Sequence, residues 1–334
     1  MSKLKQTIRV GKTEINNRLV MAPVALEKSN AGKVTKELLD YYDVRTKGGY
    51  TGFVIIEHSF IREDGRASMN QLSSSDDSDI AGLTKLADII HKNGSKTVMQ
   101  ISHAGAAAKK DVVLMEGISP SGISNPNKVL GKGDLQDTHE MSHKEIDLVI
   151  QAFVDAAIRV KKAGFDGVEL HSAHGYLLNQ FFSPITNKRT DDYTGRTIEG
   201  RIKLHIQIIQ AIRETAGEDF LLGMRLGGCD YMEGGSTIDE AAIAAPKLVE
   251  AGLDFMDISG GLCFFIRAGH NEAGYFGDLS EAVKKTISVP VILAGGVTNG
   301  IDAEKLLTEN KADMIAVGRP ISQKESWAKE VIES

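Results

Sequence analysis

The chain has 334 residues, of which 42% are hydrophobic and 25% are charged, and its formal net charge is −6. This composition allows a large buried core, and the acidic balance without any basic block argues against a nucleic-acid partner. Two cysteines, Cys229 and Cys263, are too few for a disulfide framework or an iron–sulfur cluster, so we expect both to be free and buried.

The sequence suggests neither a secretory signal nor a membrane span. Residues 1–17 lack the apolar stretch of a secretory signal, and no run approaches the ~20 apolar residues that a membrane span needs. We therefore expect a soluble, cytoplasmic protein with no membrane partner.

Short apolar runs rich in β-forming residues recur along the chain. Their interiors are apolar at successive positions, which is typical of strands covered on both faces. The predicted strands are residues 18–24, 52–58, 96–102, 166–172, 221–227, 254–260, 290–296 and 313–319.

Amphipathic helical patterns fill the gaps between these runs. The clearest covers residues 142–164, where Ser142 and Glu145 form a capping box and Gly164 ends the helix. In residues 36–47 the pattern places Leu38, Tyr42 and Arg45 on one stripe. The other predicted helices are residues 79–94, 199–217, 238–252, 278–287 and 302–310.

Eight strand–helix units of about 40 residues each predict an α/β protein, a (β/α)8 TIM barrel. The main alternative is a doubly wound open sheet, which usually has a Gly-rich turn after its first strand, whereas APVALEKSNAGK follows the first strand here. No linker suggests a boundary, so we expect residues 1–334 to form a single domain. Residues 104–141 are interpreted as an insertion after the third strand.

The active sites of barrels lie at the C-terminal ends of the strands. The last two strands end in Gly295-Gly296 and Gly318-Arg319, a pattern that favours a phosphate site made by backbone N–H groups and a following short helix, although these glycines could also only turn the chain. The other strand ends carry Pro23, Glu57, His58, Gln100, His103, His171, His174, Tyr176, Arg225, Gly260 and Gly261.

These motifs resemble those of the old yellow enzyme family over about residues 8 to 325. The most specific segment is residues 163–195, which contain ELHSAHGYLLNQFFSP, and NRLVMAP, MQISHAG, GMRL, ILAGGVTNG and IAVGRP support it. The resemblance implies an FMN-binding barrel that takes electrons from NADH or NADPH. It also implies hydride transfer from N5 of reduced FMN to an activated alkene by a ping-pong mechanism.

The resemblance also implies the catalytic roles. His171 and His174 would donate hydrogen bonds to the carbonyl oxygen of the alkene, as an oxyanion hole does. Tyr176 would deliver the proton, because a phenol is protonated at pH 7. Structural histidines are the alternative, and a metal site is disfavoured because no HExxH helix or nearby cysteine accompanies the pair.

For the cofactor, the resemblance places Arg225 at the N1–C2=O edge of the flavin, with a structural salt bridge as the alternative. Gln100 suits the pyrimidine edge because an amide both donates and accepts. His58 either contacts the flavin or lies on the surface, and His103 is interpreted as structural. The complete set expected to bind FMN is Pro23, Val24, Ala25, His58, Gln100, Arg225, Gly261, Gly295, Gly296, Gly318 and Arg319.

The sequence departs from the family pattern at several positions. Ala25 stands where many relatives carry threonine or cysteine, and Ala106 and Ala107 follow HAG where relatives often have a basic residue, which here comes later, at Lys109 and Lys110. The chain stops at Ser334 without the cysteines of two-part relatives, so we expect a stand-alone form, and we allow for a homo-oligomer. A flavin carrier or sensor and a flavin-free phosphate-binding lyase remain alternative functions.

Overall fold

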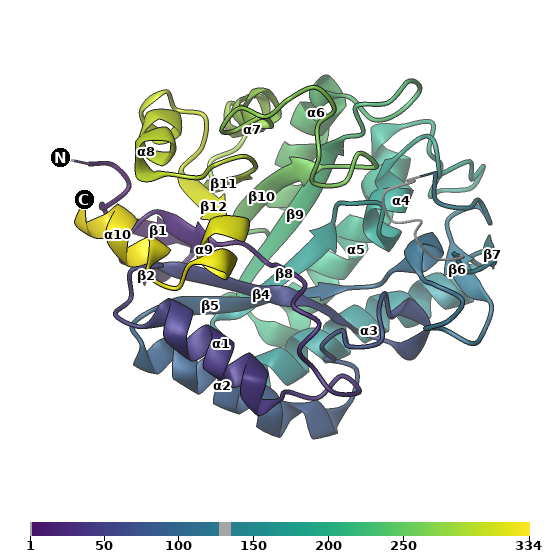
Figure 1. Cartoon of the computed structure of the whole chain (residues 1–334). Helices are drawn as coiled ribbons and strands as arrows, with labels where there is room; N and C mark the ends of the chain where they lie inside the picture. Colours follow the sequence, from purple (N-terminus) through teal and green to yellow (C-terminus); the bar gives the residue numbers. More distant parts are fainter. Residues whose placement is uncertain (1, 127–134) are drawn as a thin grey trace.

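Eight parallel strands close into a barrel in the computed structural model, which describes residues 2–126 and 135–334 (Figure 1). This arrangement confirms the predicted (β/α)8 fold. Neighbouring strands around the barrel are β3 (Leu19–Met21), β4 (Phe53–Phe60), β5 (Lys96–Ser102), β8 (Gly167–Ser172), β9 (Leu221–Cys229), β10 (Phe255–Gly260), β11 (Val291–Ala294) and β12 (Met314–Val317), which pairs with β3.

All eight predicted strands are present, but the first and the last two are shorter than predicted. Strand β11 stops at Ala294 because Gly295 and Gly296 have φ angles of 142° and 69°, outside the extended region. Strand β3 stops at Met21, two residues before Pro23, which has no N–H to donate to a ladder.

The seven predicted helices surround the barrel, and their observed ends lie within a few residues of the predictions. They are α1 (Lys36–Thr46), α2 (Ile80–Lys92), α3 (His143–Lys162), α5 (Ile198–Ala216), α6 (Ile238–Glu250), α7 (Gly277–Lys284) and α8 (Gly300–Thr308). The capping box of Ser142 and Glu145 is confirmed. On α1, Leu38 and Tyr42 are buried as predicted, whereas Arg45 is only half-buried and donates hydrogen bonds to the carbonyls of Ile321 and Ser322.

Apart from the short helix expected after the last strand, several short elements had no prediction, because three to seven residues carry little periodic signal. An antiparallel hairpin of β1 and β2 precedes the barrel, β6 pairs with β7 in the connection from β5 to α3, and short helices follow β8 and β12. These elements are β1 (Ile8–Val10), β2 (Thr13–Ile15), β6 (Gly117–Ser119), β7 (Thr138–Glu140), α4 (Leu177–Phe182), α9 (Arg319–Gln323), α10 (Trp327–Glu333) and the 3-10 turns η1 (Glu63–Gly65), η2 (Asp77–Asp79) and η3 (Gly105–Ala107).

The interior of the barrel changes from apolar to polar along the strands. Near the start of the strands, Phe53 and Phe255 meet edge to face with ring centroids 5.5 Å apart, among apolar side chains that include Val10 and Ile15 of the hairpin. Further along, the buried side chains are Gln100, Glu169, Arg225 and Asp257. The polar end is therefore the end at which a barrel builds its site.

Two further expectations concern the cysteines and membrane-spanning segments. Both cysteines are free, but only Cys229 is buried, and Cys263 is partly exposed because it lies in the connection after β10, so the prediction that both are buried is wrong for Cys263. Within residues 2–126 and 135–334, no helix combines the length and apolar character needed to cross a membrane.

Candidate active site

A cavity of about 850 Å³ opens where the barrel strands end. Its size lies within the roughly 300–1,000 Å³ typical of cofactor and small-molecule sites. Thirteen of the fourteen predicted site residues line it: Pro23, Val24, Ala25, His58, Gln100, His171, His174, Tyr176, Arg225, Gly295, Gly296, Gly318 and Arg319.

The remaining predicted residue, Gly261, is not among the lining residues. Its N–H donates to the carbonyl of Cys229, and an added Cβ would lie 2.3 Å from Oδ1 of Asp230. Gly261 therefore packs against the connection that follows β9, and the structure does not bring it to the site.

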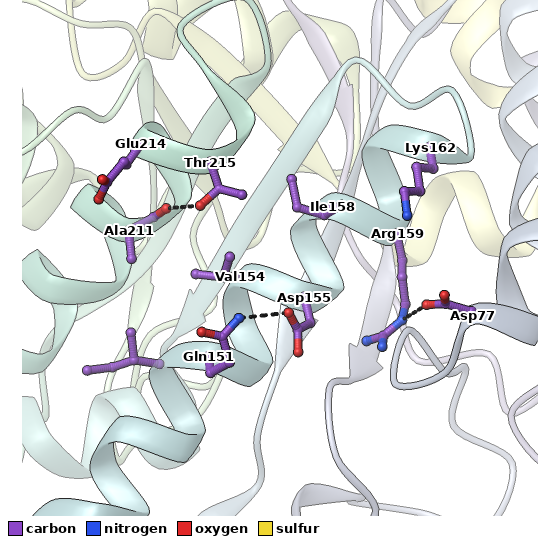
Figure 2. A pocket seen from close by; sticks show the side chains of 11 residues that line it. Asp77, Gln151, Val154, Asp155, Ile158, Arg159, Lys162, Ala211, Glu214 and Thr215 are labelled. Atoms are coloured by element: carbon purple, nitrogen blue, oxygen red, sulfur yellow. Dashed lines mark hydrogen bonds and ion pairs between the residues drawn. The ribbon is translucent and has the colours of Figure 1, made fainter.

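A second hollow, of about 580 Å³, lies between the outer helices α3 and α5 (Figure 2). Four of its polar side chains form two pairs: Arg159 with Asp77 at 2.7 Å, and Gln151 with Asp155 at 2.8 Å. It contains none of the predicted residues and lies on the outside of the helical layer. The cavity at the strand ends is therefore the candidate active site.

Two imidazoles and a phenol converge in this cavity. The ring of His171, at the end of β8, has its centroid 5.1 Å from that of His174 and 4.8 Å from that of Tyr176. His174 adopts φ 60° and Gly175 φ 73°, so the chain turns sharply after β8 before α4 begins. A left-handed residue other than glycine is uncommon and costs of order 1 kcal/mol or more, and such strain concentrates at functional sites.

Both imidazoles are neutral at pH 7. Burial holds the pKa of His171 and of His174 well below the usual 6.5, and the nearby Arg225 guanidinium lowers both further. Each ring therefore carries one N–H. Nε2 of His174 lies 2.8 Å from the hydroxyl of Ser259, whereas the buried Nδ1 of His171 has no hydrogen-bond partner within the described chain. A buried polar atom of this kind fits a site whose ligand completes it.

Tyr176 presents a phenol to the same cavity. Burial raises the pKa of its phenol above the usual 10, so the hydroxyl stays protonated across the neutral range. Its ring centroid also lies 5.3 Å from that of His58.

His58 is buried and lines the cavity, so the alternative of a surface histidine is wrong. Nε2 of Gln71 lies 3.0 Å from Nδ1 of His58, and Oε1 of Gln71 accepts the N–H of Ala67. The amide of Gln71 is thus oriented to donate, which makes Nδ1 of His58 the acceptor and leaves the proton on Nε2. Burial lowers the pKa of His58 to about 4, so this imidazole is also neutral.

Arg225 both lines the cavity and has an acidic partner. Its Nε lies 3.2 Å from Oδ2 of Asp257, whose side chain is fully buried. The structural ion pair considered as an alternative therefore exists, but it leaves the guanidinium on the cavity wall. Nε2 of Gln100 donates to Oε1 of Glu169 at 2.7 Å, so one N–H of that amide is already used.

The two glycine-rich strand ends border the same cavity. A Cβ at Gly296 would lie 2.4 Å from the carbonyl oxygen of Glu272, and one at Gly295 would lie 2.9 Å from the ring of Tyr275, so only glycine fits without displacement. Gly318 is the N-cap of α9, the short helix expected after the last strand. Backbone N–H groups, a helix start and Arg319 together form a place suited to a phosphate.

Much of the cavity wall was not predicted. The connection after β10 and its neighbours contribute Ser259, Phe264, Phe265, Ile266, Arg267, His270, Asn271, Tyr275, Phe276, Thr298 and Gln323. The pair Phe264-Phe265, which follows the Gly260-Gly261 strand end after two residues, was the available signal, because aromatic residues in a loop at the active end of a barrel indicate a ligand surface.

The structural interpretation of His103 is consistent with its contacts. Its Nε2 lies 3.4 Å from Oδ1 of Asp64 and its Nδ1 accepts the N–H of Gly105, away from the cavity wall. Ala106 and Ala107 are buried in the packing around η3, and Lys110 pairs with Asp137 at 3.1 Å. The substitutions after HAG therefore affect packing outside the cavity lining.

These residues fit FMN. A glycine cradle that no side chain could enter lies at one part of the cavity, and a buried cation and an amide lie at another. A planar ring system with a phosphate needs these groups, since the phosphate requires N–H donors and the negative edge of the ring requires a cation.

A family model described as the NADH:flavin oxidoreductase / NADH oxidase family matches residues 3–333. The NADH oxidase of Thermoanaerobacter brockii is 38% identical over 332 residues, which cover 97% of this chain and 50% of that protein. The NADPH dehydrogenase of Halalkalibacterium halodurans is 34% identical over 318 residues, covering 95% and 90%. A metal reductase of Desulforamulus reducens is 33% identical over 332 residues, covering 96% and 47%.

Two solved structures are also similar to this chain. A 2-naphthoyl-CoA reductase superposes with a TM-score of 0.92 at 29% identity, covering 99% of this chain and 52% of that one. An old yellow enzyme homologue from Zymomonas mobilis superposes with a TM-score of 0.87 at 25% identity, covering 99% and 92%.

The chain thus spans about half the length of three of these relatives and nearly all of two others. The predicted resemblance to the old yellow enzyme family is confirmed, and with it FMN as the cofactor. The chain belongs to the NADH:flavin oxidoreductase / NADH oxidase family.

Proposed function

We propose that the protein is an FMN-dependent oxidoreductase that takes electrons from NADH or NADPH and reduces an electron-poor alkene in a ping-pong cycle. The single observation that carries this proposal is the convergence of His171, His174, Tyr176 and Arg225 on one cavity that also contains the glycine cradle. The catalytic roles of the first three and the cofactor contacts of the remaining lining residues are part of the proposal.

FMN supplies the two-electron chemistry when it is bound. Negative charge develops on the carbonyl oxygen of the alkene during its reduction, and the neutral rings of His171 and His174 each offer an N–H toward it. Donors of this kind are worth about 3 kcal/mol each in comparable oxyanion holes. Tyr176 holds the proton that the α-carbon needs, and Arg225 opposes negative charge on the cofactor.

The ping-pong order is supported by the single cavity. No GxGxxG motif follows the first strand, and one space of about 850 Å³ holds both the cofactor residues and the histidine pair. A nucleotide and an alkene that use the same space must enter in turn.

The proposal of an electron-poor alkene as the electron acceptor rests on the site residues and on the names of the relatives. The 2-naphthoyl-CoA reductase carries the name of a conjugated organic acceptor, whereas other relatives are named for the oxidation of NADH or the reduction of metals. The pair of N–H donors beside a phenol favours an acceptor with a carbonyl group, because neither a metal ion nor oxygen requires that set.

The first test is the visible spectrum of the purified protein under anaerobic conditions, before and after adding NADPH, then NADH, and finally a conjugated enone. A yellow protein that a nucleotide bleaches and the enone restores agrees with the proposal. A colourless protein that takes up no FMN refutes it in favour of the lyase. Bleaching without reoxidation by enones refutes the alkene as acceptor, and a yellow protein that neither nucleotide bleaches indicates a carrier or sensor.

Tyr176→Phe then separates the two halves of the cycle. Losing a positioned proton donor typically slows its step by about 10²-fold or more, so reoxidation by the enone should slow by that factor. Bleaching by the nucleotide should be unchanged, because that step needs no phenol. Tyr193→Phe is the matched control, since Tyr193 is also buried but donates to Gln207 outside the cavity.

A further inference from the structure

Beneath the cavity, the barrel interior contains a group of four polar side chains, one from each of four neighbouring strands. Gln100 of β5 is in register with Glu169 of β8, and Arg225 of β9 is in register with Asp257 of β10. Gln100 and Arg225 reach the cavity wall, whereas Glu169 and Asp257 do not line the cavity and are fully buried. The two carboxyl groups therefore lie directly behind the residues expected to face the cofactor.

Most oxygen atoms of these two carboxyl groups have no hydrogen-bond partner among the described residues. Oε1 of Glu169 accepts from Gln100, but Oε2 of Glu169 and both oxygens of Asp257 have no hydrogen-bond partner in residues 2–126 and 135–334. The ion contact of Asp257 is the one with Nε of Arg225 at 3.2 Å. One guanidinium thus contacts Asp257, while Glu169, which contacts Gln100, has no cation of its own among the described residues and feels only the more distant charge of Arg225.

The neighbouring side chains offer the two carboxyl groups little further positive charge. His171, His174 and His58 lie on the cavity side and are neutral, because burial lowers the pKa of each. On the other flank β11 presents Ile292, in register with Asp257. In so dry an interior one cation can offset one anion, so the second carboxyl group is held as a neutral acid.

The charges can be assigned from these contacts. Burial, followed by the charge of Asp257, raises the pKa of Glu169 well above its ordinary value. Burial raises the pKa of Asp257 to about 6, with Arg225 acting in the opposite direction. With Glu169 as the acid and Asp257 ionised beside Arg225, the group contains one acid, one carboxylate and one guanidinium, and its net charge is zero.

We propose that the Glu169–Asp257 pair takes up one proton whenever the bound cofactor is reduced to its anion. Reduced FMN carries a negative charge, and Arg225 is the cation expected to face it. The site would then hold two anions against one cation, and the uncompensated negative charge is unfavourable in a poorly hydrated interior. A proton on the remaining carboxylate removes this cost. The inference depends on the FMN site but not on the alkene.

The balance of the step is simple. The reduction of FMN to its anion consumes two electrons and one proton, and the proton becomes the hydrogen on N5. When NADH or NADPH is the donor, its hydride carries both electrons and that hydrogen. The second proton comes from the solvent and forms an O–H bond on the carboxylate of the pair, and it returns to the solvent on reoxidation.

Photochemical reduction of the FMN-loaded protein at about pH 8 gives the direct test, because it needs neither a nucleotide nor an alkene. The reduced-minus-oxidised infrared spectrum should show a new C=O band of a protonated carboxyl group. The midpoint potential should fall by about 59 mV per pH unit, since two protons accompany two electrons, against about 30 mV for one proton. NADPH added to a weakly buffered solution should consume about one proton per FMN.

The double variant Glu169→Gln/Asp257→Asn is expected to lose the carboxyl band and the proton uptake. The slope of its midpoint potential against pH should fall by half. Both acids are replaced because either one alone can accept the proton. Asp254→Asn is the matched control. It removes a carboxylate just before β10, where Asp254 pairs with Arg213, and it should behave like the wild type.

The outcomes are distinct. Absence of the carboxyl band in the wild-type protein overturns the inference whether or not the variant folds. Proton uptake that persists in the double variant also overturns it, since the proton would then reside on the flavin. A protein that shows the band on photoreduction but is not bleached by either nucleotide contradicts the proposed reductase function alone.

Discussion

Nε2 of His174 lies 2.8 Å from the hydroxyl oxygen of Ser259, and the N–H of His174 donates to the carbonyl of Gly260 at 3.3 Å. The end of β10 therefore holds the imidazole that follows β8. His174 has a left-handed backbone and no support from a regular element, so this contact sets the rotation of its ring.

Ser259→Ala should accordingly slow reoxidation of the protein by an enone. Losing one hydrogen bond of about 1 kcal/mol corresponds to about fivefold in rate. Reduction by NADPH should be unaffected, and rapid-mixing absorbance measurements separate the two steps. Ser172→Ala is the control, because Ser172 makes a similar 2.9 Å contact with the buried His205 outside the cavity lining. Equal effects of the two variants would contradict the role given to Ser259.

Buried neutral histidines should make the fold sensitive to acid. Burial lowers the pKa of His205 to about 4. Below about pH 6.5 the unfolded chain binds a proton that the folded chain does not, so the free energy of unfolding decreases as pH falls from about 6.5 toward 4. Between about pH 7.5 and 5 this histidine alone accounts for about 2 kcal/mol.

His205→Gln should remove that part of the pH dependence of the free energy of unfolding, because glutamine keeps a polar group near Ser172 and does not titrate. Urea unfolding at the two pH values measures it. The comparison with the wild-type protein also cancels the opposite contribution of buried acids such as Glu57, whose pKa burial raises to about 8. His270→Gln, at a more exposed imidazole, is the control. An unchanged pH dependence in His205→Gln would contradict the assignment.

Gly296→Ala should weaken FMN binding by at least about tenfold. An alanine Cβ would lie 2.4 Å from the carbonyl of Glu272, so the cradle must shift. Gly234→Ala is matched in backbone strain, with φ 73° against 69°, but has nothing within 4 Å of the new Cβ. Its effect should be limited to a stability loss of about 1 kcal/mol. Fluorescence titration of the apo-protein with FMN gives both affinities, and equal losses would exclude the clash as the cause.

Ala25 lines the cavity but donates no side-chain hydrogen bond. We expect Ala25→Thr to raise the two-electron potential of the flavin by about 20 mV, because a new hydrogen bond of about 1 kcal/mol would stabilise the reduced ring. Potentiometric titration of both proteins measures the shift, and Ala25→Val controls for the added volume. A potential that stays the same or falls in Ala25→Thr would refute the idea.

Periodic patterns explain why so much of the fold could be predicted. The runs at 96–102 and 166–172 are apolar at successive positions, and both became strands with nearly the predicted bounds. The helix α3 begins after Ser142, where the capping box satisfies N–H groups locally. Such signals depend on neighbours along the chain, so they need no tertiary information.

The candidate site was predictable where its residues follow strand ends. His171 and Gly295 lie at or directly after the C-terminal ends of β8 and β11, Arg225 lies inside the longer strand β9, and barrel closure brings all three to one cavity. The rule fails for Gly261, which has the right position in the sequence but packs against Cys229 and Asp230. Position along a strand does not specify which side of the backbone meets the cavity.

Residue order alone was enough to establish eight strands, the helices between them and a set of polar side chains at one end of a barrel, because periodicity, capping and strand direction are local properties of a chain. Only the folded arrangement decided that His58 faces the cavity, that Ser259 holds His174, and that Asp257 pairs with Arg225 beside the buried Glu169. These relationships join residues that are far apart in the sequence, for instance His174 and Ser259, which are 85 positions apart. Burial and pKa depend on what surrounds a group in space, and this is set when the strands close on one another.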